Sequence, residues 1–258
     1  MQPVFTCSAL SAYARCPRQY CWAYERAFKP INYGAPILLG LGVHRVLEIL
    51  YRTSSEEAAL EAATGYESVH PLEWWRELTS GYLKTYAAEL ADGGERLVEH
   101  EFAIALPHGV QFAGRIDLLL GGSLLDHKST WRTTPDRWAR NRSWEQLSTY
   151  AMALEHEGHS VAELAYNVII ADARTRNRFF RVKRPVDVRE LKVMPIRISN
   201  CALRVLEAKD FPARRGPQCK ACGYAPLCEW KLEPDVSDEA VAAAGFVRKS
   251  RRHEELSP

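Results

Sequence analysis

The spacing of apolar side chains along the chain changes several times between helical and strand-like periods. Apolar residues three or four positions apart predict helices, and alternating or short continuous apolar runs bounded by turn residues predict strands. The helices predicted in this way cover residues 6–27, 38–51, 71–90, 143–157 and, despite Pro195, 187–209. Residues 54–66 are small and acidic, which fits either a helix or an exposed connection.

Five strand-like stretches fall between these helices. They cover residues 97–106, 110–120, 123–129, 164–172 and 179–183, and a basic turn joins the last two. Strands and helices that alternate without an internal repeat or a low-complexity linker predict one α/β domain, over residues 1–234. The stretch 235–258 is Ala-rich and then basic, and we expect it to form a C-terminal tail.

Composition narrows the class of protein. The 258-residue chain is 47% hydrophobic and 26% charged, which is typical of a globular domain and argues against disorder or fibres. No apolar run approaches the roughly 18 residues that span a bilayer, and no secretory signal is recognisable, so we expect no membrane association. The net charge of +2 neither requires nor excludes a polyanionic partner, so a binding site for one would have to come from a local cluster of basic residues. Seven cysteines without an export signal predict a reducing compartment, the cytoplasm.

Three of the cysteines form a tight group, Cys219-x2-Cys222-x5-Cys228. Cysteines two residues apart can turn both sulfurs onto one ion, and a nearby glycine and proline allow the third to follow. Three thiolates leave one ligand position open, for which Cys16 is the first choice and Cys21 the second. Thiolate ligation favours zinc or an iron–sulfur cluster, and the spacing does not separate them. The structural alternative is three thiols without a metal.

The most informative segment is a predicted hairpin. Two apolar stretches flank Gly121-Gly122, a strong signal for a two-residue turn. With these glycines as the turn, Asp117 lies opposite Asp126, and Lys128 projects from the same face as Asp126. The structural alternative is a solvated Asp–Lys pair on an exposed strand, and a different turn register would remove the opposition.

Two opposed carboxylates on such apolar strands repel each other and resist burial. A divalent cation between them removes both costs, and Mg²⁺ or Mn²⁺ prefers oxygen ligands of this kind. Lys128 could then orient or help deprotonate an attacking water, or stabilise charge that develops on a phosphate. The hairpin therefore predicts a site for metal-assisted hydrolysis.

Three further polar residues have both structural and functional interpretations. His44 lies on an apolar helix, where a histidine more often packs than binds a metal. Gln146 and Tyr150 are four residues apart and so share one helix face. Gln146 also stands three residues after Ser143, the spacing of a helix capping box, and Tyr150 could simply pack.

Taken in order, these motifs resemble the PD-(D/E)XK nuclease superfamily. The resemblance is to its RecB-type branch with a cysteine-ligated iron–sulfur cluster, which includes the nuclease domains of RecB and AddB and the CRISPR-associated RecB-like exonucleases. The matching segments are SALSAYARCPRQY, LGLGVHRVLE, GRID, DHK, QLSTY and CKACGYAPLC, which together span about residues 7–230. Ile116 replaces the proline of the superfamily's name, and Asp126 replaces a frequent Glu; both variants occur in RecB-like members.

The resemblance implies the fold and the role of each motif residue. It implies a mixed central β-sheet flanked by helices, a restriction-endonuclease-like core, whose segments 7–30 and 210–230 are joined by the cluster. The implied metal ligands are Asp117, Asp126, His44 and the backbone carbonyl of His127, with Lys128 as the motif lysine. Gln146 and Tyr150 match the motif that orients this lysine and contacts DNA. The implied ligands of a structural [4Fe–4S] cluster are Cys16, Cys219, Cys222 and Cys228.

Two clusters of basic and aromatic residues could follow a phosphate backbone, since arginine beside aromatic rings suits single strands. The first consists of Arg132, Arg137, Arg140 and Arg142, interleaved with Trp131, Trp138 and Trp144. The second consists of Arg174, Arg176, Arg178, Arg181, Lys183 and Arg184, with Phe179 and Phe180. The structural alternative for each is solvated charge around a surface loop.

The main functional hypothesis is a Mg²⁺- or Mn²⁺-dependent DNA exonuclease. It would act on single-stranded DNA or frayed ends in recombination, repair, CRISPR adaptation or phage DNA processing. The chain has no G-x-x-x-x-G-K-[ST] phosphate loop, so we expect a helicase or integrase partner to supply unwinding or integration. A second hypothesis is a non-catalytic DNA-binding subunit with a vestigial nuclease site. A third is a zinc-stapled binding module, which leaves the opposed carboxylates unexplained.

Overall fold

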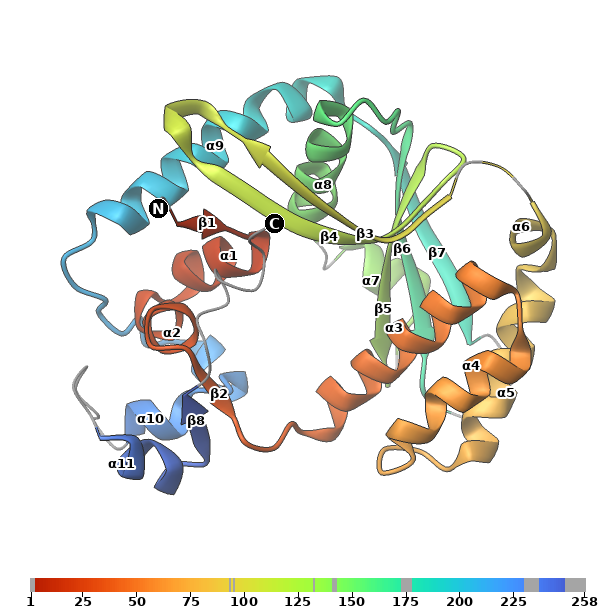
Figure 1. The fold of residues 1–258 in the computed structure, drawn as a ribbon, viewed down its shortest axis with the longest axis horizontal. Coiled ribbons are helices and arrows are strands. Elements are labelled where there is room, and N and C mark those ends of the chain that lie inside the picture. Colours follow the sequence, from red (N-terminus) through yellow and green to blue (C-terminus); the bar gives the residue numbers. More distant parts are fainter. Residues whose placement is uncertain are drawn as a thin grey trace. The chain divides into compact units, whose positions relative to one another are not determined.

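A computed structural model describes residues 3–92, 94, 96–131, 133–140, 143–172, 178–229 and 237–248 (Figure 1). The chain divides into two compact units. The first, here called the cysteine unit, comprises residues 1–33, 103–114 and 193–258. The second, the sheet unit, comprises residues 34–102 and 115–192. Three elements continue along the chain from one unit into the other: β3 (Arg96–Ala105), β4 (Gln111–Leu120) and α9 (Val188–Glu207).

The described part of the sheet unit contains six helices and three further strands. The helices are α3 (Ala35–Thr53), α4 (Glu56–Ala63), α5 (Leu72–Thr85), α6 (Ala87–Ala91), α7 (Pro135–Arg140) and α8 (Glu145–His156). The strands are β5 (Ser123–Thr130), β6 (Glu163–Ile170) and β7 (Phe179–Pro185).

In the described part of the cysteine unit the elements are short. They are β1 (Val4–Phe5), α1 (Cys7–Arg15), α2 (Pro17–Tyr20), a π-helical turn (Cys21–Glu25), β2 (Phe28–Pro30), α10 (Ala225–Glu229), α11 (Asp238–Ala243) and β8 (Phe246–Arg248). Single 3₁₀ turns cover Thr64–Tyr66 in the sheet unit, and Pro107–Gly109 and Pro217–Ala221 in the cysteine unit.

Six of the described strands form a mixed sheet in the order β1-β4-β5-β6-β7, in which β3 also pairs with β4. The other two, β2 and β8, pair with each other. The β4–β5 and β6–β7 pairs are antiparallel, whereas β1–β4 and β5–β6 are parallel. Parallel neighbours need a crossover connection, which α7 and α8 provide between β5 and β6. The mixed α/β fold with a central sheet flanked by helices is therefore confirmed.

The predicted hairpin turn is confirmed. Gly121 and Gly122 have φ angles of 53° and 81°, which a two-residue hairpin turn of this kind requires and which glycine adopts without a steric cost. Leu120 pairs with Ser123, and the pairing continues to Leu118 and Leu125, where it ends. Asp117 and Asp126 thus lie just beyond the last residue pair that joins β4 to β5.

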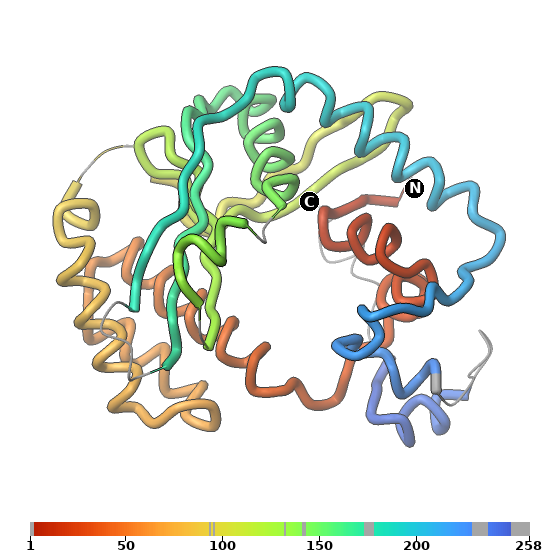
Figure 2. Tube along the Cα trace, turned by 180° about the vertical axis from the view of Figure 1, so that it is seen from behind, coloured from red at the N-terminus to blue at the C-terminus, as the bar shows by residue number. Residues whose placement is uncertain are grey.

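Helices pack on both faces of the sheet in the sheet unit (Figures 1 and 2). On one face, Leu118 and Leu125 join a buried apolar cluster with residues of α3 and α5, including Leu47 and Trp75. On the other face, Tyr166 of β6 lies against Trp138 and Trp144, and its hydroxyl donates to the carbonyl of Ser143 at the start of α8. Successive residues of β5 therefore face different helices, because side chains alternate along a strand.

Two predicted helices are interrupted. The helix predicted over residues 6–27 breaks at Cys16, whose φ and ψ of −160° and 110° are extended. The cause is Pro17, because a proline disfavours helical geometry in the residue before it. The helix predicted over 71–90 divides at Tyr86 into α5 and α6. The helix across Pro195 forms as predicted, as α9, and the ambiguous stretch 54–66 is mainly the helix α4.

The prediction that residues 235–258 form a tail is wrong for residues 238–248. These residues form α11 and β8, and β8 pairs antiparallel with β2. The reason is apolar burial: Val241 and Phe246 belong to a buried cluster with Trp22, Phe28 and Leu227. Residues 249–258 lie outside the described residues. No helix in the described part of the chain combines the length and apolar character that crossing a membrane requires.

Candidate metal and nuclease site

The carboxylate of Asp117 lies where the paired part of the β4–β5 hairpin ends. Its Oδ1 is 3.4 Å from Nδ1 of His44 on α3, and its Oδ2 accepts the backbone N–H of His127 at 2.6 Å. Glu99 of β3 completes the group, because one ligand atom each from His44, Glu99 and Asp117 lie within 4.8 Å of one another. Three separate elements thus place metal-binding side chains at one point.

The charges in this group depend on one another. Burial opposes ionisation of Asp117, yet the imidazole of His44 and the backbone N–H of His127 lower its pKa to about 2. Burial likewise opposes the charged form of His44, but the Asp117 carboxylate outweighs it and raises the pKa of His44. Asp117 is therefore a carboxylate at neutral pH.

Asp126 and Lys128 occupy the neighbouring strand and form an ion pair. Lys128 Nζ lies 2.6 Å from Asp126 Oδ2. Burial, together with the negative charge of Asp117, raises the pKa of Asp126 to about 6, although Lys128 partly offsets this. Asp126 and Lys128 are two residues apart on β5 and so project from the same face. Asp126 pairs with Tyr166, whose side chain contacts α7 and the start of α8, so this is the face that carries those helices. The two acids thus influence each other across the end of the hairpin.

The side chain of His127 is fully buried, and the resemblance assigned a role only to its carbonyl. Burial lowers the pKa of its imidazole to about 3, so the ring is neutral. Its Nδ1 lies 3.0 Å from Nδ2 of Asn167, and its ring stacks on Tyr51 at 5.9 Å. Because the amide nitrogen is a donor, Nδ1 accepts and the ring proton resides on Nε2.

A polar network fixes this amide. Asn167 Nδ2 also donates to the hydroxyl of Tyr82 at 2.8 Å, and its Oδ1 accepts from Nε of Arg181 at 3.3 Å. Arg181 in turn forms an ion pair with Glu89. The network holds β5 and β6 in one arrangement directly behind the candidate site. Sequence analysis did not find it, since the residues are far apart in the chain and individually ordinary.

Gln146 and Tyr150 contact each other on α8. Gln146 Nε2 donates to the Tyr150 hydroxyl at 3.3 Å. The alternative capping box does not form, because the side chain of Ser143 accepts from the N–H of Glu145, while Gln146 points along the helix. Tyr150 is buried and lies edge-on against Phe102 of β3, with ring centroids 5.6 Å apart.

Glu99 is the acidic residue that sequence analysis missed. It has a φ of 49°, a left-handed conformation that is rare for a non-glycine residue within a strand. Its side chain is 11% exposed and forms an ion pair with Arg115 at 2.8 Å. Burial and the nearby charge of Asp117 raise the pKa of Glu99. The strand pattern does not distinguish Glu99 from the other acids of β3, so only the tertiary contact identifies it.

The first basic cluster is partly described. Arg132 and Arg142 lie outside the described residues, whereas Arg137 and Arg140 are exposed on α7. Trp138 between them is buried beside Tyr166, so its own ring is not available to stack on a base. Trp131 is 43% exposed.

The described basic residues of the second cluster form ion pairs with acidic residues of the same chain. The ion pairs are Arg178 with Glu77, Arg181 with Glu89, Lys183 with Glu163 and Arg184 with Glu190. Phe179 packs on Tyr82 and Tyr86. A DNA-binding role for these charges, suggested by the sequence, is therefore not supported by their contacts.

The four predicted cysteine ligands belong to the cysteine unit and influence one another. Burial and the neighbouring thiols of Cys228, Cys16 and Cys219 raise the pKa of Cys222, while a backbone N–H partly offsets this. Cys16 Sγ also accepts the backbone N–H of Arg214 at 3.3 Å. No three of these described cysteines have their sulfur atoms all within 4.8 Å of one another.

Cys21, the second choice for the fourth ligand, is buried within the π-helical turn. Burial raises the pKa of its thiol, with Arg26 acting against it. The nearby thiols that affect Cys222 include Cys16 and not Cys21. Cys16 thus influences the pKa of Cys222 together with Cys219 and Cys228.

Comparison with known proteins identifies the family and the fold of the chain. The family model of the PD-(D/E)XK nuclease superfamily matches residues 4–229. A proposed exonuclease from Eubacterium rectale is 12% identical, with 93% of each chain covered and a TM-score of 0.56, and so shares the fold. An alkaline exonuclease from Laribacter hongkongensis is 14% identical over 76% of this chain and 97% of that chain, with a TM-score of 0.34. No curated protein matches the chain. Because the family model covers most of the sequence, the protein belongs to the PD-(D/E)XK nuclease superfamily.

Proposed function

We propose that this protein is a divalent-metal-dependent DNA exonuclease that hydrolyses phosphodiester bonds in single-stranded DNA or at frayed ends. The observation that carries the proposal is the convergence of His44, Glu99 and Asp117 beside the Asp126–Lys128 pair. This convergence occurs on a fold whose superfamily consists of nucleases that use divalent metals.

The donor set fits Mg²⁺ or Mn²⁺. Carboxylate oxygens dominate it, and such hard ligands suit these ions, whereas soft thiolates do not. The raised pKa of Asp126 shows that its negative charge is disfavoured beside Asp117, a cost that a cation would remove. The ion would be held by Asp117, Asp126, His44 and the carbonyl of His127, and we add Glu99 to this set. When bound, it acts as a Lewis acid on the phosphodiester.

The protein's own groups divide the remaining work. Lys128 is held by Asp126, so its ammonium group is positioned to orient the attacking water and to donate to a phosphoryl oxygen as negative charge grows there. Gln146 and Tyr150 would position Lys128 and contact DNA. Asp117 keeps His44 in place through the 3.4 Å contact, which fixes the geometry of the donors before substrate arrives.

We further propose that Cys16, Cys219, Cys222 and Cys228 bind a structural [4Fe–4S] cluster. Mutual electrostatic influence supports one shared site. A single tetrahedral zinc, with Zn–S bonds of about 2.3 Å, would hold its sulfurs within about 4 Å of one another. A [4Fe–4S] cluster would instead bind each of its four cysteines to a different iron. The resemblance to the RecB-type branch is what favours the cluster over zinc.

DNA is the expected partner, and Arg137 and Arg140 on α7 are its proposed phosphate contacts in the described chain. Arg132 and Arg142 are proposed from the sequence alone. The pathways consistent with this activity are recombination, repair, CRISPR adaptation and phage DNA processing, with a helicase or integrase as a further partner. The cysteine chemistry favours the reducing cytoplasm.

The deciding experiment incubates the anaerobically purified protein with end-labelled single-stranded DNA and Mn²⁺ or Mg²⁺. Lys128→Ala and Asp126→Ala are assayed beside it, with Lys192→Ala, a substitution on α9 outside the site, as a control. Metal-dependent release of label that both site variants lose and the control keeps would support the nuclease. DNA binding without degradation would instead favour a non-catalytic subunit with a vestigial site.

A further inference from the structure

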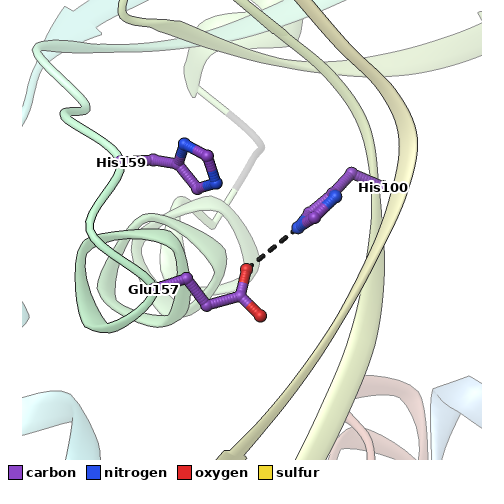
Figure 3. Close-up of side chains that lie close together, drawn as sticks. All are labelled: His100, Glu157 and His159. Carbon is purple, nitrogen blue, oxygen red and sulfur yellow. Dashed lines mark hydrogen bonds and ion pairs between the residues drawn. The ribbon is translucent and has the colours of Figure 1, made fainter.

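A second group of metal-binding side chains lies in the sheet unit, apart from the residues assigned above. It consists of His100 on β3, Glu157 at the end of α8 and His159 two residues later (Figure 3). One ligand atom from each lies within 4.8 Å of the others. His100 Nε2 and Glu157 Oε2 are 2.9 Å apart, and the two imidazole rings are edge-on with centroids 5.7 Å apart. In Figure 3 the three side chains converge on a common point.

The backbone explains why these residues meet. His100 is two residues before Phe102 and so shares its face of β3, which packs against Tyr150 of α8. The helix then ends in a tight cap: the N–H of Gly158 donates to the carbonyl of Glu155, and that of His159 to Leu154.

This cap requires a left-handed residue, which Gly158 supplies with a φ of 92°. It fixes the backbone of Glu157 and His159 on either side of the glycine. Two of the three donors therefore come from a rigid turn, and the third from a paired strand.

The donor chemistry differs from that of the nuclease site. Two imidazole nitrogens and one carboxylate oxygen suit Zn²⁺, which commonly takes three protein ligands and leaves one position for water or another small ligand. The side chains of His100 and Glu157 are 30% and 25% exposed, so an ion can reach them from solvent. A hydrogen bond between an imidazole and a carboxylate involves only His100 and Glu157. The ligand atom of His159 lies within 4.8 Å of both, which gives the three donors that a metal site uses.

We propose that His100, Glu157 and His159 form a Zn²⁺ site that fastens β3 to the end of α8. The site is separate from the Mg²⁺ or Mn²⁺ position and is predicted from different residues. Its ion would connect the strand that carries Glu99 with the helix that carries Gln146 and Tyr150. The proposal does not depend on whether the protein cleaves DNA.

The test measures Zn²⁺ binding to the full-length, anaerobically purified protein with its cysteine group loaded. The titration is made in the Asp117→Asn background, which disables the His44, Glu99 and Asp117 group that Zn²⁺ would otherwise also occupy. Isothermal titration with Zn²⁺ is expected to show one site. His100→Ala and His159→Ala should weaken it by at least about tenfold, which corresponds to about 1.4 kcal/mol. His156→Ala is the matched control, because His156 is exposed on the last turn of α8 and lies outside the group.

Two further measurements keep the result interpretable. Glu157→Gln retains the shape of the side chain but removes its charge, and should also weaken Zn²⁺ binding if the alanine variants fold poorly. Co²⁺ bound at this site should give visible ligand-field bands without the sulfur charge-transfer bands of thiolate ligation. Equal Zn²⁺ affinity in His159→Ala and its Asp117→Asn parent, or only thiolate-type Co²⁺ spectra, would overturn the proposal.

Discussion

The carboxylate site and the cysteine group differ in how far the protein alone, without a metal, positions their ligand side chains. Asp117 and Asp126 sit on paired, buried strands, and Asp117 already accepts a backbone N–H and contacts His44. The cysteines lie instead in or beside short helices and helical turns, and Cys219 is exposed. A site on strands is positioned by the apolar core, whereas a site on turns depends on its ligand for order. Substitutions in the carboxylate site should therefore lower catalytic activity, whereas substitutions of the cysteines should lower the stability of the fold.

The largest expected effect is on catalysis by Asp117→Asn. The amide cannot supply the charge that holds a cation and His44, so we expect metal-dependent cleavage of single-stranded DNA to fall by at least about 10²-fold. Iron content and the temperature of unfolding should change little. Circular dichroism, measured beside the assay, shows whether the variant is folded. If Asp117→Asn loses activity only because it unfolds, the proposed difference between the two regions is wrong.

The next largest effect is on stability through Cys16→Ser. If a structural cluster joins Cys16 to the C-terminal cysteines, its loss should remove most of the iron and lower stability by about 2 kcal/mol or more. For a chain of this size that corresponds to a fall of roughly 4–8 °C in unfolding temperature. Cys201→Ser, on α9, is the control and should keep the iron. Full iron content in Cys16→Ser would rule out this ligand and return attention to Cys21.

A smaller effect is expected from Glu99→Gln. Removing one carboxylate from the candidate ligand set should weaken Mn²⁺ binding by about tenfold while leaving the fold intact. Glu101→Gln is a matched control, because Glu101 is exposed on the same strand. Binding can be followed by the electron paramagnetic resonance signal of free Mn²⁺. Equal affinities in the two variants would show that Glu99 serves only its ion pair with Arg115.

The smallest effect is the pH dependence of metal binding. The pKa of Asp126 is raised to about 6 in the metal-free protein, so below that pH a cation must displace a proton. Mn²⁺ affinity should therefore rise by about tenfold between about pH 5 and pH 7 and then level off. Asp126→Asn should flatten this dependence, and an unchanged slope in that variant would assign the proton to another group.

The same raised pKa has a consequence for stability in the absence of metal. Below the ordinary pKa of 3.8 Asp126 is neutral both folded and unfolded, so its ionisation costs folding nothing. As the pH rises from about 3.8 to about 6, stability is lost, because the unfolded state releases its proton while the buried carboxyl of the folded state still holds it. Above about pH 6 the loss is complete. Asp126→Asn should make the metal-free protein more stable than the unmutated one at pH 8, as urea unfolding would show. The buried carboxylate that would bind the metal thus destabilises the metal-free protein.

Local pattern was sufficient for the hairpin. Gly121-Gly122 between apolar stretches predicted both the turn and its register, because a two-residue turn leaves one pairing and strand alternation then fixes each side chain's face. The apolar periods predicted most helices, and Pro195 did not interrupt α9. The order of the motifs also indicated the superfamily that the family model confirms.

Other features were decided by contacts between residues far apart in the chain. Glu99 and Glu101 are alike in sequence, and only packing against His44 and Asp117 separates them. The acidic partners of the basic residues of β7 could not be read from the sequence, since ion pairing depends on distance in space. Residues 238–248 read as a tail because their few apolar side chains find a core only when β8 meets β2. Local sequence specifies turns and faces, but charge partners and burial arise only when the chain is folded.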